Sequence, residues 1–241
     1  MTLAFDELEA PDSAFAGLDP RWKLAALVPA MLATAILQSL LMIGFVFAFS
    51  ALLLAGARLP RRFVVPRLLA LGLFLTPFML VLPLLEGRDG LLAATRVGGK
   101  ASAIYFFGLV LTATASFSRT VQAAQGFGMP RLVARVMLLS YRYVYVLADE
   151  FIRIRTALRT RGFRNRPNRT SYRVIGSVAG TMIVRGAERG ERVAWAMRCR
   201  GFDGRCRSLA EFVTRRVDIA FLVTVVAVVG GALAFDFHIR S

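Results

Sequence analysis

The chain has 241 residues, of which 56% are hydrophobic, and its formal net charge is +16. Its mean hydropathy of +0.58 is higher than soluble domains usually reach, which excludes an ordinary soluble globular protein. The hydrophobic residues also come in blocks that can cross a bilayer, which takes about 20 residues of helix. These properties indicate an integral membrane protein.

Several kinds of chemistry are missing from the sequence. It contains no phosphate-binding loop, nucleophile elbow or His-Glu-x-x-His pair, so we assign no catalytic residue and do not expect an enzyme. With one histidine, two cysteines and no cluster at metal-ligand spacing, we expect neither a metal site nor a cofactor. An Arg-rich membrane transferase that binds phosphate is the one enzyme class left open, although such enzymes usually also need acids or histidine.

The positive charge is concentrated in one segment. Residues 118–217 contain 21 arginines against six acids, a net charge of +15. Such a segment could meet nucleic acid, anionic lipid or an acidic protein. No groove-reading motif is present, so we do not expect a nucleic-acid partner. Because Lys and Arg accumulate on the cytoplasmic side of membrane proteins, we predict that this segment is cytoplasmic.

The hydrophobic blocks before this segment predict four membrane spans. Residues 24–57 are too long for one span and fit two short tilted ones, with the turn at Gln38 and Ser39. After a basic loop, residues 68–85 form the third span, in which Pro77 and Pro83 predict a kink. Residues 86–100 are expected to be an external loop of mixed charge, and 101–117 the fourth span.

Two amphipathic helices are predicted inside the basic segment, over residues 130–161 and 172–200. In the first, apolar residues recur at steps of three or four, the spacing of one helical face. Four glycines leave the continuity of the second open, because each costs about 1 kcal/mol against alanine. Ser208 to Glu211 is typical of a capping box, and residues 219–235 form the last span.

Both helices end in the same five-residue pattern. Arg159-Thr160-Arg161-Gly162-Phe163 returns 39 positions later as Arg198-Cys199-Arg200-Gly201-Phe202. Glycine after the second arginine predicts a left-handed helix stop in each copy. The arginine before it then lies in the last turn, where it complements the helix dipole. Its planar fork of donors is also available to the carboxylates of a partner.

Twin helices that end in a small residue, Arg and Gly before a last span resemble the transmembrane (T) component of energy-coupling factor (ECF) transporters, the CbiQ/EcfT family. The usual motif of that family is Ala-Arg-Gly, and here Thr160 and Cys199 replace the alanine. Two further stretches are similar to the family: Leu18-Asp19-Pro20-Arg21-Trp22-Lys23-Leu24, and Leu138-Leu139-Ser140-Tyr141-Arg142-Tyr143 followed by Asp149-Glu150.

The resemblance implies a non-catalytic subunit that links two cytoplasmic ABC ATPase subunits to a substrate-binding membrane (S) subunit in the bacterial inner membrane. The implied ATPase-coupling residues are Thr160, Arg161, Gly162, Cys199, Arg200 and Gly201. The cargo would be cobalt or nickel ion, with a vitamin as the alternative. An Arg-rich membrane scaffold or lipid-binding anchor without a motor remains a second hypothesis.

The predicted fold is an all-α integral membrane protein with about five transmembrane helices and long Arg-rich cytoplasmic coupling helices between spans 4 and 5. Residues 1–20 would form a cytoplasmic tail and 21–117 transmembrane helices 1–4. Residues 118–217 would form the coupling-helix region and 218–241 the C-terminal transmembrane helix.

Overall fold

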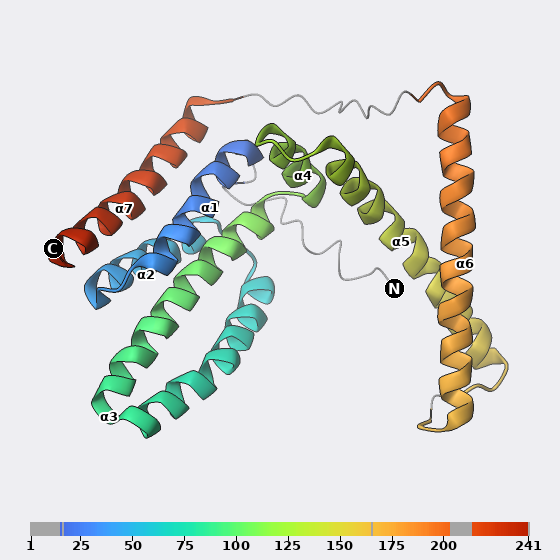
Figure 1. Cartoon of the computed structure of the whole chain (residues 1–241), viewed down its shortest axis with the longest axis horizontal. Helices are drawn as coiled ribbons and strands as arrows, with labels where there is room; N and C mark the ends of the chain where they lie inside the picture. Colours follow the sequence, from blue (N-terminus) through green and yellow to red (C-terminus); the bar gives the residue numbers. More distant parts are fainter. Residues whose placement is uncertain (1–14, 16, 165, 203–213, 241) are drawn as a thin grey trace. The chain divides into compact units, whose positions relative to one another are not determined.

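The computed structural model describes residues 15, 17–164, 166–202 and 214–240, and every regular element in them is an α-helix (Figure 1). These residues form two compact units. The membrane unit comprises the described residues up to 129 and from 214 onward. The helix-pair unit comprises those from 130 to 202. The predicted tail over 1–20 and the capping box at 208–211 fall almost entirely outside the described residues.

The membrane unit opens with two short helices, α1 (Pro20–Ile36) and α2 (Leu40–Gly56), each of 17 residues. Asp19 caps α1 by accepting a hydrogen bond from the Arg21 N–H at 3.0 Å. Pro20 occupies the first helical position, where its missing N–H would have no helical partner anyway. The turn falls at residues 37–39, which confirms its predicted place at Gln38 and Ser39.

The next helix, α3 (Arg61–Thr114), is a hairpin of two arms that meet at Gly87 (Figure 1). Gly87 has φ +60° and ψ −125°, a conformation that glycine adopts readily because it has no Cβ. The arms, Arg61–Leu85 and Gly87–Thr114, are 25 and 28 residues long, and both are long and apolar enough to cross a membrane.

The prediction of a loop over residues 86–100 is therefore wrong, because this stretch is helical apart from Gly87. Charged residues suggested a loop, but at least one of them is accommodated on the helix. The ammonium of Lys100 donates to the carbonyl oxygen of Ala35 at 3.1 Å, the kind of partner that lets a charged side chain remain on an apolar arm. The turn between the arms needs one glycine and no loop.

Helix α7 (Arg216–Arg240) closes the unit, and 24 of its residues can also cross a membrane. Its buried face carries Val225, Val229 and Ala232 between two buried carboxylates, Asp218 and Asp236. The two acids lie 18 residues apart, five turns of an α-helix, so they share that face. The described helices thus include three that are both long and apolar enough to span, counting the two arms of α3 separately, together with the two short helices α1 and α2. The prediction of five spans stays a prediction.

Each carboxylate of α7 accepts hydrogen bonds from the backbone at the start of another helix. Asp218 accepts from the N–H of Asp19, just before α1, at 2.9 Å, and also from the N–H of Arg215, just before its own helix, at 2.7 Å. Asp236 accepts from the N–H of Ser39 at 2.7 Å and from that of Gln38 at 3.2 Å. Helix starts carry unpaired N–H groups and a partial positive charge, so buried acids stabilise them.

The core of the membrane unit lies among α1, α2, the second arm of α3 and α7. Its fully buried side chains include Leu27, Val46, Phe107 and Val225. A Cβ on Gly99 would come within 2.7 Å of Ile43 Cγ2, so glycine is needed where α3 passes α2. Small residues at helix crossings are typical of membrane proteins, whose helices associate by close packing.

A short helix, α4 (Phe117–Gly126), follows α3 and was not predicted. A break in the helical chain follows it. Gly128 has φ +93° and Pro130 precedes the first residue of the next helix. The helix-pair unit then consists of α5 (Arg131–Thr160) and α6 (Arg169–Cys199). Both agree with the predicted helices, and α6 is continuous through its four glycines.

Candidate functional site

The first five-residue pattern forms the end of α5. Thr160 is the last helical residue, Arg161 is the C-cap, and Gly162 has φ +78°. The N–H of Gly162 donates to the carbonyl of Arg159, and the N–H of Phe163 donates to that of Leu158, both at 3.0 Å. This pair of bonds defines a Schellman cap, which pairs carbonyls that the helix end would leave free.

The second pattern forms the same cap at the end of α6. Cys199 is the last helical residue, Arg200 is the C-cap, and Gly201 has φ +73°. The N–H groups of Gly201 and Phe202 donate to the carbonyls of Arg198 and Met197, again both at 3.0 Å. The sequence repeat is therefore a repeat of backbone geometry, and the predicted left-handed stops are confirmed in both copies.

Each cap leaves its arginine exposed to solvent. Arg161 and Arg200 lie one residue beyond the last helical residue, slightly later than predicted, and neither has an ion-pair partner among the described residues. The hydroxyl of Thr160 donates back to the carbonyl of Ala157 at 2.9 Å, while Cys199 is an exposed free thiol. The small neighbours predicted before each arginine are thus on the surface with it.

The two caps lie at opposite ends of the helix pair and do not form one site. After the end of α5 the chain turns into the start of α6, whose far end carries the second cap (Figure 1). With 31 residues at 1.5 Å each, α6 separates the two caps by about 45 Å. The structure therefore places two similar arginine ends far apart on one body.

The helices cross where Glu150 of α5 forms an ion pair with Arg185 of α6. Beside Arg185, a Cβ on Gly186 would lie 3.9 Å from Leu147 Cδ2, an ordinary van der Waals contact, so the two helices pack against each other there. The ion pair fixes which turns of the two helices face each other. Sequence reasoning missed this pair, because a match between two charges 35 residues apart has no local signature.

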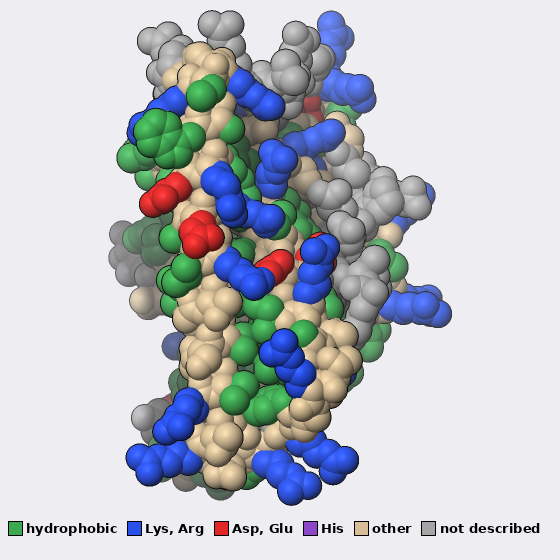
Figure 2. Space-filling view, turned by 90° about the vertical axis from the view of Figure 1, so that its right-hand side faces the viewer, with side chains coloured by type: hydrophobic (Ala, Val, Ile, Leu, Met, Phe, Trp, Pro, Cys, Tyr) green, Lys and Arg blue, Asp and Glu red, His purple; other side chains and the backbone are tan. Residues whose placement is uncertain are grey.

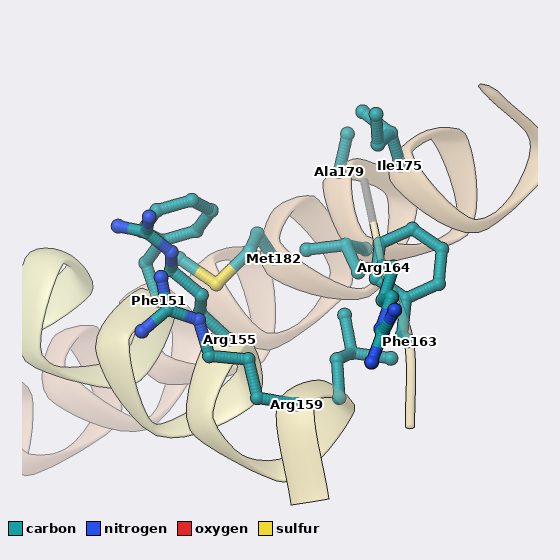
Figure 3. A pocket seen from close by; sticks show the side chains of 10 residues that line it. Phe151, Arg155, Arg159, Phe163, Arg164, Ile175, Ala179 and Met182 are labelled. Atoms are coloured by element: carbon teal, nitrogen blue, oxygen red, sulfur yellow. The ribbon is translucent and has the colours of Figure 1, made fainter. Parts of the chain in front are cut away.

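Beyond the crossing, the pair encloses a groove of about 760 Å³ between the end of α5 and the start of α6 (Figure 3). Aliphatic and aromatic side chains from both helices form most of its lining, and three arginines complete it. The lining residues are Phe151, Arg155, Leu158, Arg159, Phe163, Arg164, Ile175, Val178, Ala179 and Met182. The motif arginines 161 and 200 are not among them.

The surface of the pair combines basic and apolar side chains. Figure 2 shows blue Lys and Arg side chains on this face of the molecule, with few red acids and with green hydrophobic side chains between them. Leu132 is 65% exposed, Ile183 72% and Trp195 63%. These large apolar side chains are available for contact with a protein or a membrane.

Comparison of the sequence with models of known protein families identifies the family of this chain independently of the geometry. The model of one family, described as CbiQ, cobalt transport protein, matches residues 12–211. The chain belongs to the CbiQ family. The matched range contains both Schellman caps, the crossing and the groove. As a member of a transport family with long apolar helices, the chain is a membrane protein.

Individual relatives of this CbiQ-family chain are distant. It is 29% identical over 171 residues to the cobalt transport protein CbiQ of Rhodobacter capsulatus, covering 68% of this chain and 69% of that protein. Two uncharacterized proteins of Methanocaldococcus jannaschii, MJ1571 and MJ1089, are 22% and 26% identical over 61% and 63% of this chain. The chain spans about half the length of these two, 51% and 56%.

Proposed function

We propose that this chain is the T component of an ECF-type importer. In this role it is a non-catalytic subunit that couples ATP hydrolysis by two cytoplasmic ATPase subunits to the movement of a substrate-binding membrane subunit. One observation carries the proposal. Two Schellman caps of the same geometry stand at opposite ends of one helix pair, and each presents an exposed arginine, Arg161 or Arg200.

Two helix ends of the same geometry suit two copies of a similar partner subunit. Two similar ATPase subunits would offer two similar grooves, and the length of α6 would set their separation at about 45 Å. A guanidinium presents a planar fork of donors that matches a carboxylate, so acidic side chains are its expected partners. The glycine after each arginine turns the chain away, which leaves the helix end free to enter a groove.

A helix pair that joins two docking points can transmit motion. When the ATPases close on ATP, the two caps move with them, and the crossing at Glu150 and Arg185 carries that movement along both helices. The exposed apolar residues of α5 and α6 offer a surface on which the substrate-binding subunit can rest. Movement of the helices would then tip that subunit in the membrane.

The proposed cargo is cobalt or nickel ion. Support comes from the family description and from the relative that is named a cobalt transport protein. The ion is cargo of the assembly, and selection among ions would reside in the substrate-binding subunit. A T component serving a vitamin transporter would share the same caps. We place the complex in the bacterial inner membrane.

Charge reversal at the caps tests the proposal. Arg161→Glu and Arg200→Glu are expected to leave membrane insertion intact, weaken co-purification of the ATPases and abolish uptake. Truncating one partner of a desolvated charge pair costs about 2–5 kcal/mol. For an exposed pair the effect stays below about 1 kcal/mol. Arg166→Glu, in the connection between the helices, and Arg169→Glu, at the first residue of α6, are the matched controls and should retain most uptake.

Two results would contradict this function. Equal loss of uptake in all four variants would mean that bulk charge at the membrane surface matters and the caps do not. No change in ATPase binding or uptake in the cap variants would favour a membrane scaffold without a motor. Steady ATP turnover by the isolated chain, with no ATPase subunit present, would contradict its non-catalytic role.

A further inference from the structure

The groove between α5 and α6 has two chemical halves. Its floor is hydrocarbon from both helices, including Phe151, Leu158 and Met182. Arg155, Arg159 and Arg164 are its charged lining residues, and all three are exposed (Figure 3). A volume of about 760 Å³ lies within the range of roughly 300–1,000 Å³ typical of small-molecule sites. The occupant that suits this lining has an apolar body and an anionic head.

The sequence around the groove arginines contains no acidic residue from 151 to 187. The same stretch contains nine arginines. Among the described residues, none of the three groove arginines forms an ion pair. Arginine cannot lose its charge at physiological pH, so three guanidinium groups around one groove attract an anion from outside the chain.

We propose that this groove binds an anionic phospholipid. One acyl chain lies along the apolar floor, and the headgroup phosphate accepts hydrogen bonds from the guanidinium groups of Arg155, Arg159 and Arg164. Basic pockets beside apolar surface on the cytoplasmic side of membrane proteins bind such headgroups. The proposed anchors Arg161 and Arg200 do not line the groove, although the groove shares Leu158, Arg159 and Phe163 with the first cap.

The connections of the helix pair favour lipid over an acidic protein segment as the occupant. The pair is joined to apolar helices at both ends, through α4 to α3 and onward to α7, so it stays tethered to a membrane. The cytoplasmic leaflet is negatively charged and attracts nearby arginines. Apart from the arginines, no lining side chain is a good hydrogen-bond donor or acceptor, which matches a hydrocarbon chain.

Fluorescence quenching in nanodiscs tests the site on the full chain. Met182→Trp places a reporter in the groove, and Trp22→Phe together with Trp195→Phe removes the signal of the two native tryptophans. Two samples of phosphatidylcholine nanodiscs are compared. In one, a minor fraction of the lipid is phosphatidylglycerol with brominated acyl chains; in the other, it is phosphatidylcholine with the same brominated chains. We expect the brominated phosphatidylglycerol to quench the reporter more strongly. High salt should reduce the difference, because it screens the contacts between phosphate and arginine.

Matched arginine variants separate the groove from general surface charge. R155Q/R159Q/R164Q should reduce quenching by phosphatidylglycerol to the phosphatidylcholine level. Each arginine near an anionic surface changes affinity about fivefold, so three give roughly 100-fold. R153Q/R166Q/R173Q removes the same charge at exposed positions outside the groove and should retain preferential quenching.

Native mass spectrometry repeats the test without the reporter, by counting phosphatidylglycerol retained on the unsubstituted chain and on both triple variants. Greater retention by the unsubstituted chain and R153Q/R166Q/R173Q than by R155Q/R159Q/R164Q would support the site. Equal quenching by the two lipids, or equal loss in both triple variants, would overturn it. The proposal would also be overturned if R155Q/R159Q/R164Q lost its co-purifying subunits while its lipid binding stayed unchanged. In that case the occupant of the groove would be a protein. The lipid result does not depend on ATPase docking, so either proposal can fail alone.

Discussion

Gly162→Ala isolates the backbone geometry of the first cap from its charge. A Cβ at this position would meet nothing within 4 Å, so the substitution creates no clash. The cost comes from φ +78°, a left-handed conformation that disfavours an L side chain by about 1–2 kcal/mol. If that strain is released by opening the cap, the open population rises about 5–30-fold.

Hydrogen exchange at the end of α5 measures this opening, because the N–H groups of Gly162 and Phe163 make the two bonds of the cap. In Gly162→Ala, the exchange of these two N–H groups should accelerate about 5–30-fold, in proportion to the open population. ATPase binding should weaken, because Arg161 loses its fixed position. Asparagine tolerates the left-handed region better than alanine, so Gly162→Asn should give a smaller effect.

Gly190→Ala is the control, since Gly190 lies inside α6 and a Cβ there also meets nothing within 4 Å. In a helix interior alanine stabilises the helix by about 0.5–1 kcal/mol relative to glycine, so Gly190→Ala should slow hydrogen exchange of the neighbouring backbone N–H groups of α6. The reasoning fails if Gly162→Ala exchanges and binds like the unsubstituted chain. It also fails if Gly190→Ala is impaired to the same extent.

Three further predictions concern the helix crossing, α7 and topology. Glu150→Arg should shift spin-label distances between α5 and α6, and adding Arg185→Glu should restore them. The energy involved is below about 1 kcal/mol for this partly exposed pair, and failure of the double variant would rule out the pairing. Asp236→Ala leaves two backbone N–H groups without their acceptor, at about 1–3 kcal/mol each, and should lower the melting temperature in detergent more than Asp236→Asn, which keeps one acceptor. A cysteine at Asp89 should react with an impermeant reagent outside intact cells and one at Arg166 should not; the reverse pattern would invert the predicted orientation.

Local signals in the sequence predicted the helix pair well. The apolar periodicity predicted both helices, and the glycines at 162 and 201 predicted where they end. The ends could be predicted because a Schellman cap depends on only a few neighbouring residues. The phenylalanine of each pattern was not explained in advance. Phe163 lines the groove together with Leu158, the residue whose carbonyl it caps, so it serves both the cap and the lining.

Features that join distant segments could not be predicted. Asp218 and Asp236 look like ordinary boundary acids in the sequence, and their role depends on where α1 and α2 begin in space. The α5/α6 groove likewise requires two helices to meet. The mistaken loop over 86–100 has a different cause: charged residues at a span end were given more weight than the single glycine that turns the chain.

The contact between α1 and α7 also sets a constraint on how the protein is made. Asp19 and Asp218 are 199 residues apart, and the whole helix pair is synthesised between them. At about 5–20 residues per second, the ribosome delivers the second partner roughly 10–40 s after the first. Until then the start of α2 lacks the carboxylate of Asp236, and one side of α1 lacks its neighbour. A chain that stops before α7 would leave the starts of α1 and α2 without the carboxylates that accept their N–H groups.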